Sequence, residues 1–273
     1  MAELVYDNTG RLLFTKEMKE EYTLLVPQML PMHFAMLVRV IQTMGYKVEM
    51  LNTSGKSILD YGQKYVHNDA CFPAILVIGQ LIDAVKSGKY DPHKVALVIT
   101  QTGGGCRASN YIHMLRKALE KADLAFVPVI SVNLSGLEKN PGFSLTLPFI
   151  RKALYAVFYG DLLMNVSNQV RPYEVNPGDT DRAIRVCMDF LLDDMGRGKG
   201  MSYKSMIANF DRIIDRFQAI PVAGEPKVRV GVVGEIYVKY SPPGQQQSGA
   251  VPPLRGSRAG GARPHRLRHL QDL

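Results

Sequence analysis

Short apolar runs that alternate with longer helical stretches constrain the fold of this protein more than any other feature. Apolar spacing and turn residues predict strands at residues 23–28, 47–51, 95–100 and 125–132. They predict helices at residues 31–44, 54–65, 71–86 and 106–121. Such alternation is typical of βαβ units, which place parallel strands in one sheet with helices on both faces. The expected fold class is therefore α/β.

The remainder of the sequence is expected to form three further parts. Helical spacing recurs at residues 145–166, 179–194 and 203–218. A proline- and glycine-containing linker at 221–226 precedes KVRVGVVG, which predicts the first strand of a second α/β lobe. We thus expect an α/β domain at 1–144, a helical segment at 145–220, the start of a second lobe at 221–240 and a tail at 241–273.

The tail differs from the body in composition. It holds five arginines and one aspartate, which account for half of the net charge of +8, so the charge does not indicate a nucleic-acid partner. One interpretation is a basic disordered tail. The other interpretation is a frameshift near Pro242. If codons are chosen freely and one cytosine is removed, the adjacent frame can encode PLGNNNLEQFLRSEG and then AEPVVPGLIDFVIY. The first of these segments is helix-like and the second is strand-like. We favour the frameshift, which leaves the protein truncated at its C-terminal end.

Composition limits the cellular compartments in which the protein can be expected and the chemistry of its cysteines. The sequence has no apolar run of membrane-spanning length and no secretory signal at its charged N-terminus, so we expect a cytoplasmic protein without a membrane partner. Three cysteines do not make a disulfide framework. Thiols in the cytoplasm stay reduced and are available for metal binding or catalysis.

Three polar, glycine-bearing loops are expected at one edge of the sheet. They are HNDACFPA at 67–74, QTGGGCRASNY at 101–111 and NLSGLEKNPGF at 133–143. The second and third leave the carboxyl ends of strands, and the first precedes a helix that runs back toward the start of the strand at 95–100. Ligands of doubly wound sheets bind beyond the carboxyl ends of the strands. The loops therefore predict a binding site.

Cys71 and Cys106 are the candidate metal ligands, because each stands at the start of a predicted helix. Free N–H groups and the helix dipole favour a thiolate there, which is the form that binds iron or zinc. The loop glycines allow close approach of the backbone to a bulky ligand, and the polar neighbours add hydrogen-bonding groups. The candidate cofactor-binding residues are Gly103, Gly104, Gly105, Arg107, Asn110, Asn68 and Asp69.

Plainer interpretations of the same residues remain open. A single cysteine is more often a small buried apolar residue, and a triple glycine is often only a turn. Neither candidate cysteine belongs to a CxxC motif. We interpret Cys187 as core, and we expect His33 and His113 on helix surfaces. The residues alone thus predict an α/β domain with a thiol-bearing anion site.

Long segments of the sequence resemble a known family. HNDACFPAILVIGQLIDAVKSGKYD, VALVITQTGGGCRASNYIHMLRKAL and VISVNLSGLEKNPGF closely resemble the activase-related members of the 2-hydroxyacyl-CoA dehydratase superfamily. The resemblance covers roughly residues 13–240. It implies flavodoxin-like lobes that hold a [4Fe-4S] or related iron–sulfur cluster, with Cys71 and Cys106 as ligands and Arg107 and residues 103–105 beside them. An incomplete ligand set in this sequence is the main departure from the family.

The resemblance also implies partners and a reaction. We expect an iron–sulfur module of an acyl-CoA dehydratase or activase that takes part in ATP-driven, low-potential electron transfer. It would need an ATP-dependent activator region or subunit, and a dehydratase-like second lobe or partner chain; a CoA thioester is the implied substrate. The alternatives are a non-redox α/β module that binds a phosphate or nucleotide, and a truncated fragment without function.

Overall fold

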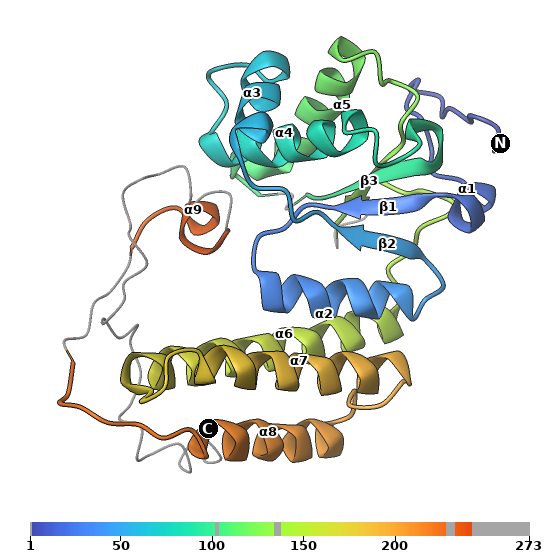
Figure 1. Ribbon diagram of the computed structural model, residues 1–273. Coiled ribbons are helices and arrows are strands. Elements are labelled where there is room, and N and C mark those ends of the chain that lie inside the picture. The colour runs from blue at the N-terminus through green and yellow to red at the C-terminus, as the bar shows by residue number, and fades with distance from the viewer. Residues whose placement is uncertain (1, 102–103, 134–137, 228–232, 242–273) are drawn as a thin grey trace. The chain divides into compact units, whose positions relative to one another are not determined.

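The computed structural model describes residues 2–101, 104–133, 138–227 and 233–241 (Figure 1). These residues group into two compact units. Unit 1 holds the residues up to Met29, Met44–Leu147 and, near the end, 236–241. Unit 2 holds Leu30–Thr43 and the described residues between 148 and 235. The break after Leu147 lies close to the expected boundary at 144.

A four-stranded parallel sheet forms the centre of unit 1. Its order is β2-β1-β3-β4, and its strands are β1 (Thr23–Val26), β2 (Lys47–Met50), β3 (Val95–Thr100) and β4 (Val129–Val132). Thr23 pairs with Lys47 on one side and with Val95 on the other. Over four strands this is the order of flavodoxin-like sheets. The expected α/β class with a parallel sheet is confirmed.

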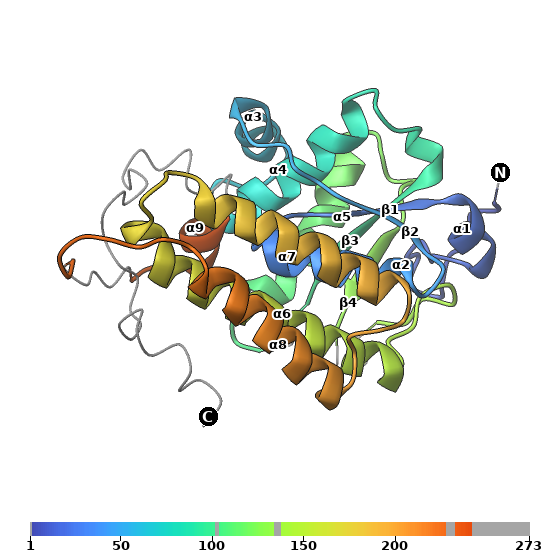
Figure 2. The same cartoon turned by 60° about the horizontal axis from the view of Figure 1, so that its bottom comes forward.

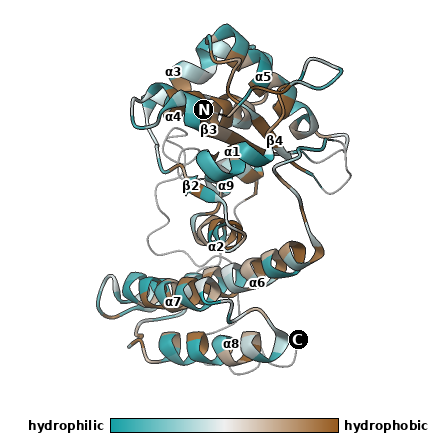
Figure 3. Ribbon diagram, turned by 90° about the vertical axis from the view of Figure 1, so that its right-hand side faces the viewer, coloured by the Kyte–Doolittle hydropathy of each residue, from teal (hydrophilic) through white to brown (hydrophobic). Residues whose placement is uncertain are grey.

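Helices on one face of the sheet bury the core of unit 1. Figure 1 shows α3 (Lys56–Tyr65), α4 (Phe72–Lys86) and α5 (Tyr111–Lys121) together on that face. Most of α4 is buried, and its side chains join those of β3, α3 and α5 in one apolar cluster. In Figure 3 the strands β3 and β4 are coloured as hydrophobic, in keeping with this burial. Their continuous apolar runs are typical of buried parallel strands.

Two glycines bring α3 and α4 into close contact. A Cβ atom added to Gly62 would lie 2.2 Å from the carbonyl oxygen of Ile75, and one added to Gly79 would lie 1.9 Å from that of Ile58. Since any side chain would meet backbone there, glycine sets the separation of the two helices. This packing fixes the end of α3 relative to the start of α4, where Cys71 lies.

Short elements complete unit 1. They are α1 (Lys16–Glu21), the 3-10 helices η1 (Pro92–Lys94) and η2 (Arg107–Asn110), and α9 (Ile236–Tyr240). The side chain of Tyr237 in α9 is buried in the core of unit 1, and Ser241 Oγ donates to the carbonyl oxygen of Gln28 at 3.3 Å. The strand expected at 227–234 falls largely outside the described residues, and so does the tail expected at 241–273 except for Ser241.

Unit 2 is built from helices. It contains α2 (Pro31–Gln42), α6 (Leu147–Val170), η3 (Arg171–Tyr173), α7 (Asp179–Gly196) and α8 (Tyr203–Gln218). Figures 1 and 2 show α7 beside α6 and α8, and one apolar cluster joins these helices to α2. Helices α6, α7 and α8 lie within residues 145–220, where the sequence predicts a helical segment. The connection from β1 to β2 runs through α2, which groups with unit 2.

His33 is buried in unit 2, so the expectation of a surface position was wrong. The residue is 5% exposed, and its Nε2 lies 3.0 Å from Asp161 Oδ1. A Cβ at Gly160 would collide with its ring. The spacing of α2 alone does not reveal that α6 covers this position. His113 is exposed, as expected.

Candidate functional site

Cys71 begins helix α4 and is partly exposed. Its backbone is extended, with φ −63° and ψ 148°, and its carbonyl oxygen accepts the N–H groups of Ala74 and Ile75. Proline in the first turn favours this start, because proline lacks an N–H group and has a helical φ. The cysteine sulfur makes no capping hydrogen bond. It instead lies 2.8 Å from the hydroxyl oxygen of Tyr111, and either atom can donate.

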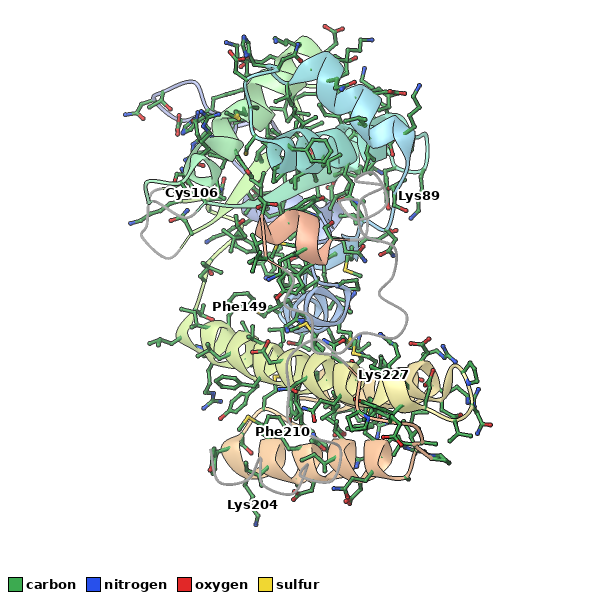
Figure 4. The ribbon with its side chains drawn as sticks, turned by 90° about the vertical axis from the view of Figure 1, so that its left-hand side faces the viewer. Lys89, Cys106, Phe149, Lys204, Phe210 and Lys227 are labelled. Carbon is green, nitrogen blue, oxygen red and sulfur yellow. The ribbon has the colours of Figure 1, made fainter. Side chains whose placement is uncertain are left out.

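Cys106 stands in the corresponding position at the start of η2 and is exposed. Its sulfur accepts the N–H group of Ala108 at 3.4 Å. Two hydrogen bonds shape the loop around it: Gln101 Nε2 donates to the carbonyl oxygen of Ser109, and Ser109 Oγ donates to that of Gly104. Figure 4 shows Cys106 at the periphery of unit 1. Its thiol is open to a ligand.

Two contacts join the loops that carry the cysteines. Besides the Cys71–Tyr111 hydrogen bond, Arg107 Nη1 donates to the carbonyl oxygen of Asp69 at 2.7 Å. Arg107 directly follows Cys106, and Asp69 lies two residues before Cys71. The structure therefore brings the two predicted loops together, with β3 ending just before one of them.

Polar side chains also link the ends of β3 and β4. Ser131 Oγ donates to Gln101 Oε1 at 2.8 Å, and Asn133 Nδ2 donates to Ser131 Oγ at the same distance. These bonds tie the start of the third predicted loop to the start of the second. Residues 134–137 of that loop lie outside the described part of the protein. Hydrogen bonds therefore connect the second and third predicted loops at the points where these loops leave β3 and β4.

The remaining predicted residues lie in the same two loops as the cysteines. Asn68, Asp69 and Asn110 are exposed. A Cβ atom at Gly104 or Gly105 would meet no heavy atom within 4 Å. Neither glycine has a positive φ. The fold therefore leaves open space beside them. Gly103 lies outside the described residues.

A cavity of about 440 Å³ lies beside these loops in unit 1. One wall is formed by Arg107 and Asn110 of η2 and by Met114, Lys117 and Lys121 of α5. The other wall comes from the end of α3 and the turn after it, and its residues are Tyr65, Val66, His67, Asp69 and Ala70. The two lysines are not among the site residues predicted from the sequence, although they continue the 3-4 spacing that starts at Arg107. That spacing was the available signal, because it places residues on one helix face.

Cys187 is separate from this site. It is fully buried in α7, where burial raises the pKa of its thiol to about 11. A protonated, sealed thiol is a poor ligand. The prediction that it belongs to the core is confirmed.

Within the described ranges, no three histidine, cysteine or acidic side chains gather into a group that could hold a metal. Cys71 and Cys106 are the cysteines that the described loops of this edge carry. No helix in the described part of the protein is both long and apolar enough to cross a membrane.

Fold and edge together define an α/β protein with a flavodoxin-like parallel sheet and a thiol-bearing loop cluster. Comparison with known proteins adds no family to this class. No protein-family model matches the sequence, and neither curated proteins nor solved structures give a match.

Proposed function

We propose that this protein is the iron–sulfur module of an acyl-CoA dehydratase or activase-type system and takes part in ATP-driven, low-potential electron transfer. The observation that supports this most is the placement of Cys71 and Cys106. Cys106 is exposed and Cys71 is partly exposed, each directly precedes a helix, and two hydrogen bonds join their loops at the carboxyl edge of the sheet. Thiolates are the protein ligands of most iron–sulfur clusters.

The donor set fits a cluster in part. Cys71 and Cys106 would supply two thiolate ligands, whereas a cubane cluster takes up to four. The remaining ligands would come from a dehydratase-like second lobe, a partner chain or non-protein ligands. A bound cluster would supply reversible acceptance of one electron. We further infer a reducing, cytoplasmic location, since both candidate ligands are free thiols.

The neighbours of the thiols have roles in this proposal. The N–H group of Ala108 and the hydroxyl group of Tyr111 would donate to the ligand sulfurs and offset their negative charge. The open space at Gly104 and Gly105 would admit the body of a bulky inorganic ligand. Arg107 would hold the Cys71 loop through the carbonyl oxygen of Asp69. An ATP-dependent activator would deliver the electron, and a CoA thioester would be the substrate.

Anaerobic reconstitution with iron and sulfide tests the proposal. The reconstituted protein should be brown and lose its visible absorbance in air. Cys71→Ala and Cys106→Ala should each bind less than half of the iron that the parent protein binds. Cys187→Ala removes a thiol outside the site and should keep full iron content. A protein that stays colourless, or equal iron content in all three variants, would refute the assignment.

A further inference from the structure

We propose that the cavity beside the thiol edge is a binding site for an organic phosphate. It lies between the turn that ends α3 and the face of η2 and α5. Its volume of about 440 Å³ falls within the range of small-molecule sites, which is roughly 300–1,000 Å³. The proposal concerns the protein without metal and does not depend on the iron–sulfur assignment.

The charge of the cavity is the first argument. Arg107, Lys117 and Lys121 line it, and the one carboxylate in the lining is that of Asp69. In the part of the protein that the structure describes, none of the three cations forms an ion pair. Two positive charges thus remain uncompensated in the lining. A concave site with excess charge concentrates ions of the opposite sign.

The spacing of the cations is the second argument. Arg107, Asn110, Met114, Lys117 and Lys121 follow one another at intervals of three and four residues, so they form one stripe along η2 and α5. Lys117 and Lys121 lie one helical turn apart, about 6 Å between their Cβ atoms. Two ammonium groups at that separation can bind one phosphate or diphosphate group together.

The apolar lining determines the rest of the ligand. Val66 is 6% exposed, Ala70 is partly buried, and Met114 packs against the core of unit 1. Met114 lies between Arg107 and Lys117 along the stripe, and Val66 and Ala70 add apolar surface on the other wall of the cavity. A bare inorganic anion would leave this surface in water. The lining therefore fits a phosphate group that is attached to a less polar body, as in a nucleotide.

Calorimetry on the full metal-free protein tests the site with ADP, adenosine and inorganic pyrophosphate as probes. ADP should bind, and adenosine, which lacks phosphate, should bind at least tenfold more weakly. The double variant Lys117→Gln/Lys121→Gln should weaken ADP binding at least tenfold. The matched control is Lys16→Gln/Lys94→Gln, which removes two exposed lysines of unit 1 outside the cavity. It should change ADP affinity less than twofold.

A second variant tests the apolar part. Met114→Ala should weaken ADP severalfold and leave pyrophosphate unchanged, because only the organic body lies on Met114. Absence of ADP binding to the parent protein would overturn the proposal, and so would equal weakening by the two lysine pairs. An equal effect of Met114→Ala on ADP and pyrophosphate would contradict the organic ligand. All these readouts are made without iron, so their failure is distinct from failure of cluster assembly.

Discussion

The sulfur of Cys71 lies 2.8 Å from the hydroxyl oxygen of Tyr111, forty residues further along the sequence. Tyr111 is the first residue of α5 and directly follows η2, which begins after Cys106. One hydrogen bond therefore relates the start of α4 to the segment that carries the second thiol. A substitution at Tyr111 should therefore alter the surroundings of the Cys71 sulfur and leave both cysteines in place.

Replacing Tyr111 with phenylalanine should lower the reduction potential of a reconstituted cluster and retain its iron. Hydrogen bonds to ligand sulfurs stabilise the more negative, reduced state, so their loss favours the oxidised state. Redox titration followed by visible absorbance measures the shift. Tyr61→Phe is the control, because the Tyr61 ring stacks on Tyr65 in the same unit and the hydrogen bonds of the two cysteine sulfurs go to Tyr111 and Ala108 instead. Equal potentials in the two variants would argue against a role for the Tyr111 hydroxyl.

Gly104→Ala and Gly105→Ala should reduce iron incorporation without reducing stability. Neither position has a positive φ, and an added methyl group would meet no atom within 4 Å. The free energy of unfolding should therefore change by less than about 0.5 kcal/mol, as for most surface substitutions. Urea titration measures stability, and iron analysis after reconstitution measures incorporation. If both variants incorporated as much iron as the parent protein, these glycines would serve only to form a turn.

The sequence predicted the strands and the long helices because their apolar spacing is local. It also predicted that the Cys71 and Cys106 loops meet, because parallel strands end at one edge of a sheet. The hydrogen bond to Tyr111 required knowledge of how α5 packs on α4, which no local pattern contains. The sequence did not predict the burial of His33 for the same reason, because its partner Asp161 lies on another helix. The short α1 has too few residues to show a helical period.

Gly79→Ala should destabilise unit 1. A methyl group there would lie 1.9 Å from the carbonyl oxygen of Ile58, so α3 and α4 would have to separate. Overpacking of this kind costs about 1–3 kcal/mol, which exceeds the gain of up to about 1 kcal/mol in helix propensity from glycine to alanine. Thermal unfolding followed by circular dichroism measures the loss.

The control for this prediction is Gly55→Ala. Gly55 has an extended φ of 163°, and a methyl group there would meet no atom within 4 Å. Its stability should stay close to that of the parent protein. If Gly79→Ala were as stable as Gly55→Ala, the close contact of α3 with α4 would not exist in solution.

Glu138 should stabilise the fold at neutral pH and lose this effect in acid. It is 11% exposed and accepts hydrogen bonds from Arg116 at 2.6 and 2.8 Å and from Arg11 at 3.0 Å. Burial alone would raise the pKa of Glu138, but the hydrogen bonds and charges of Arg116 and Arg11 outweigh it and hold the pKa below the ordinary 4.5. The folded state therefore binds the proton less readily than the unfolded state.

The pH dependence follows from that sign. The stabilisation by Glu138 is fully present above pH 4.5, the ordinary pKa, and is lost as pH falls through the lower pKa of the folded state. Glu138→Gln should cost about 2 kcal/mol at pH 7, because it leaves two partly buried arginines without their carboxylate. Urea titration should show the difference from the parent protein shrinking below pH 4.5. Glu120→Gln, at an exposed position of α5, should show little difference at either pH. If the stability difference between Glu138→Gln and the parent protein stayed constant down to about pH 3, the charges of Glu138, Arg11 and Arg116 would not hold the segment around Arg11 and the end of the third loop together.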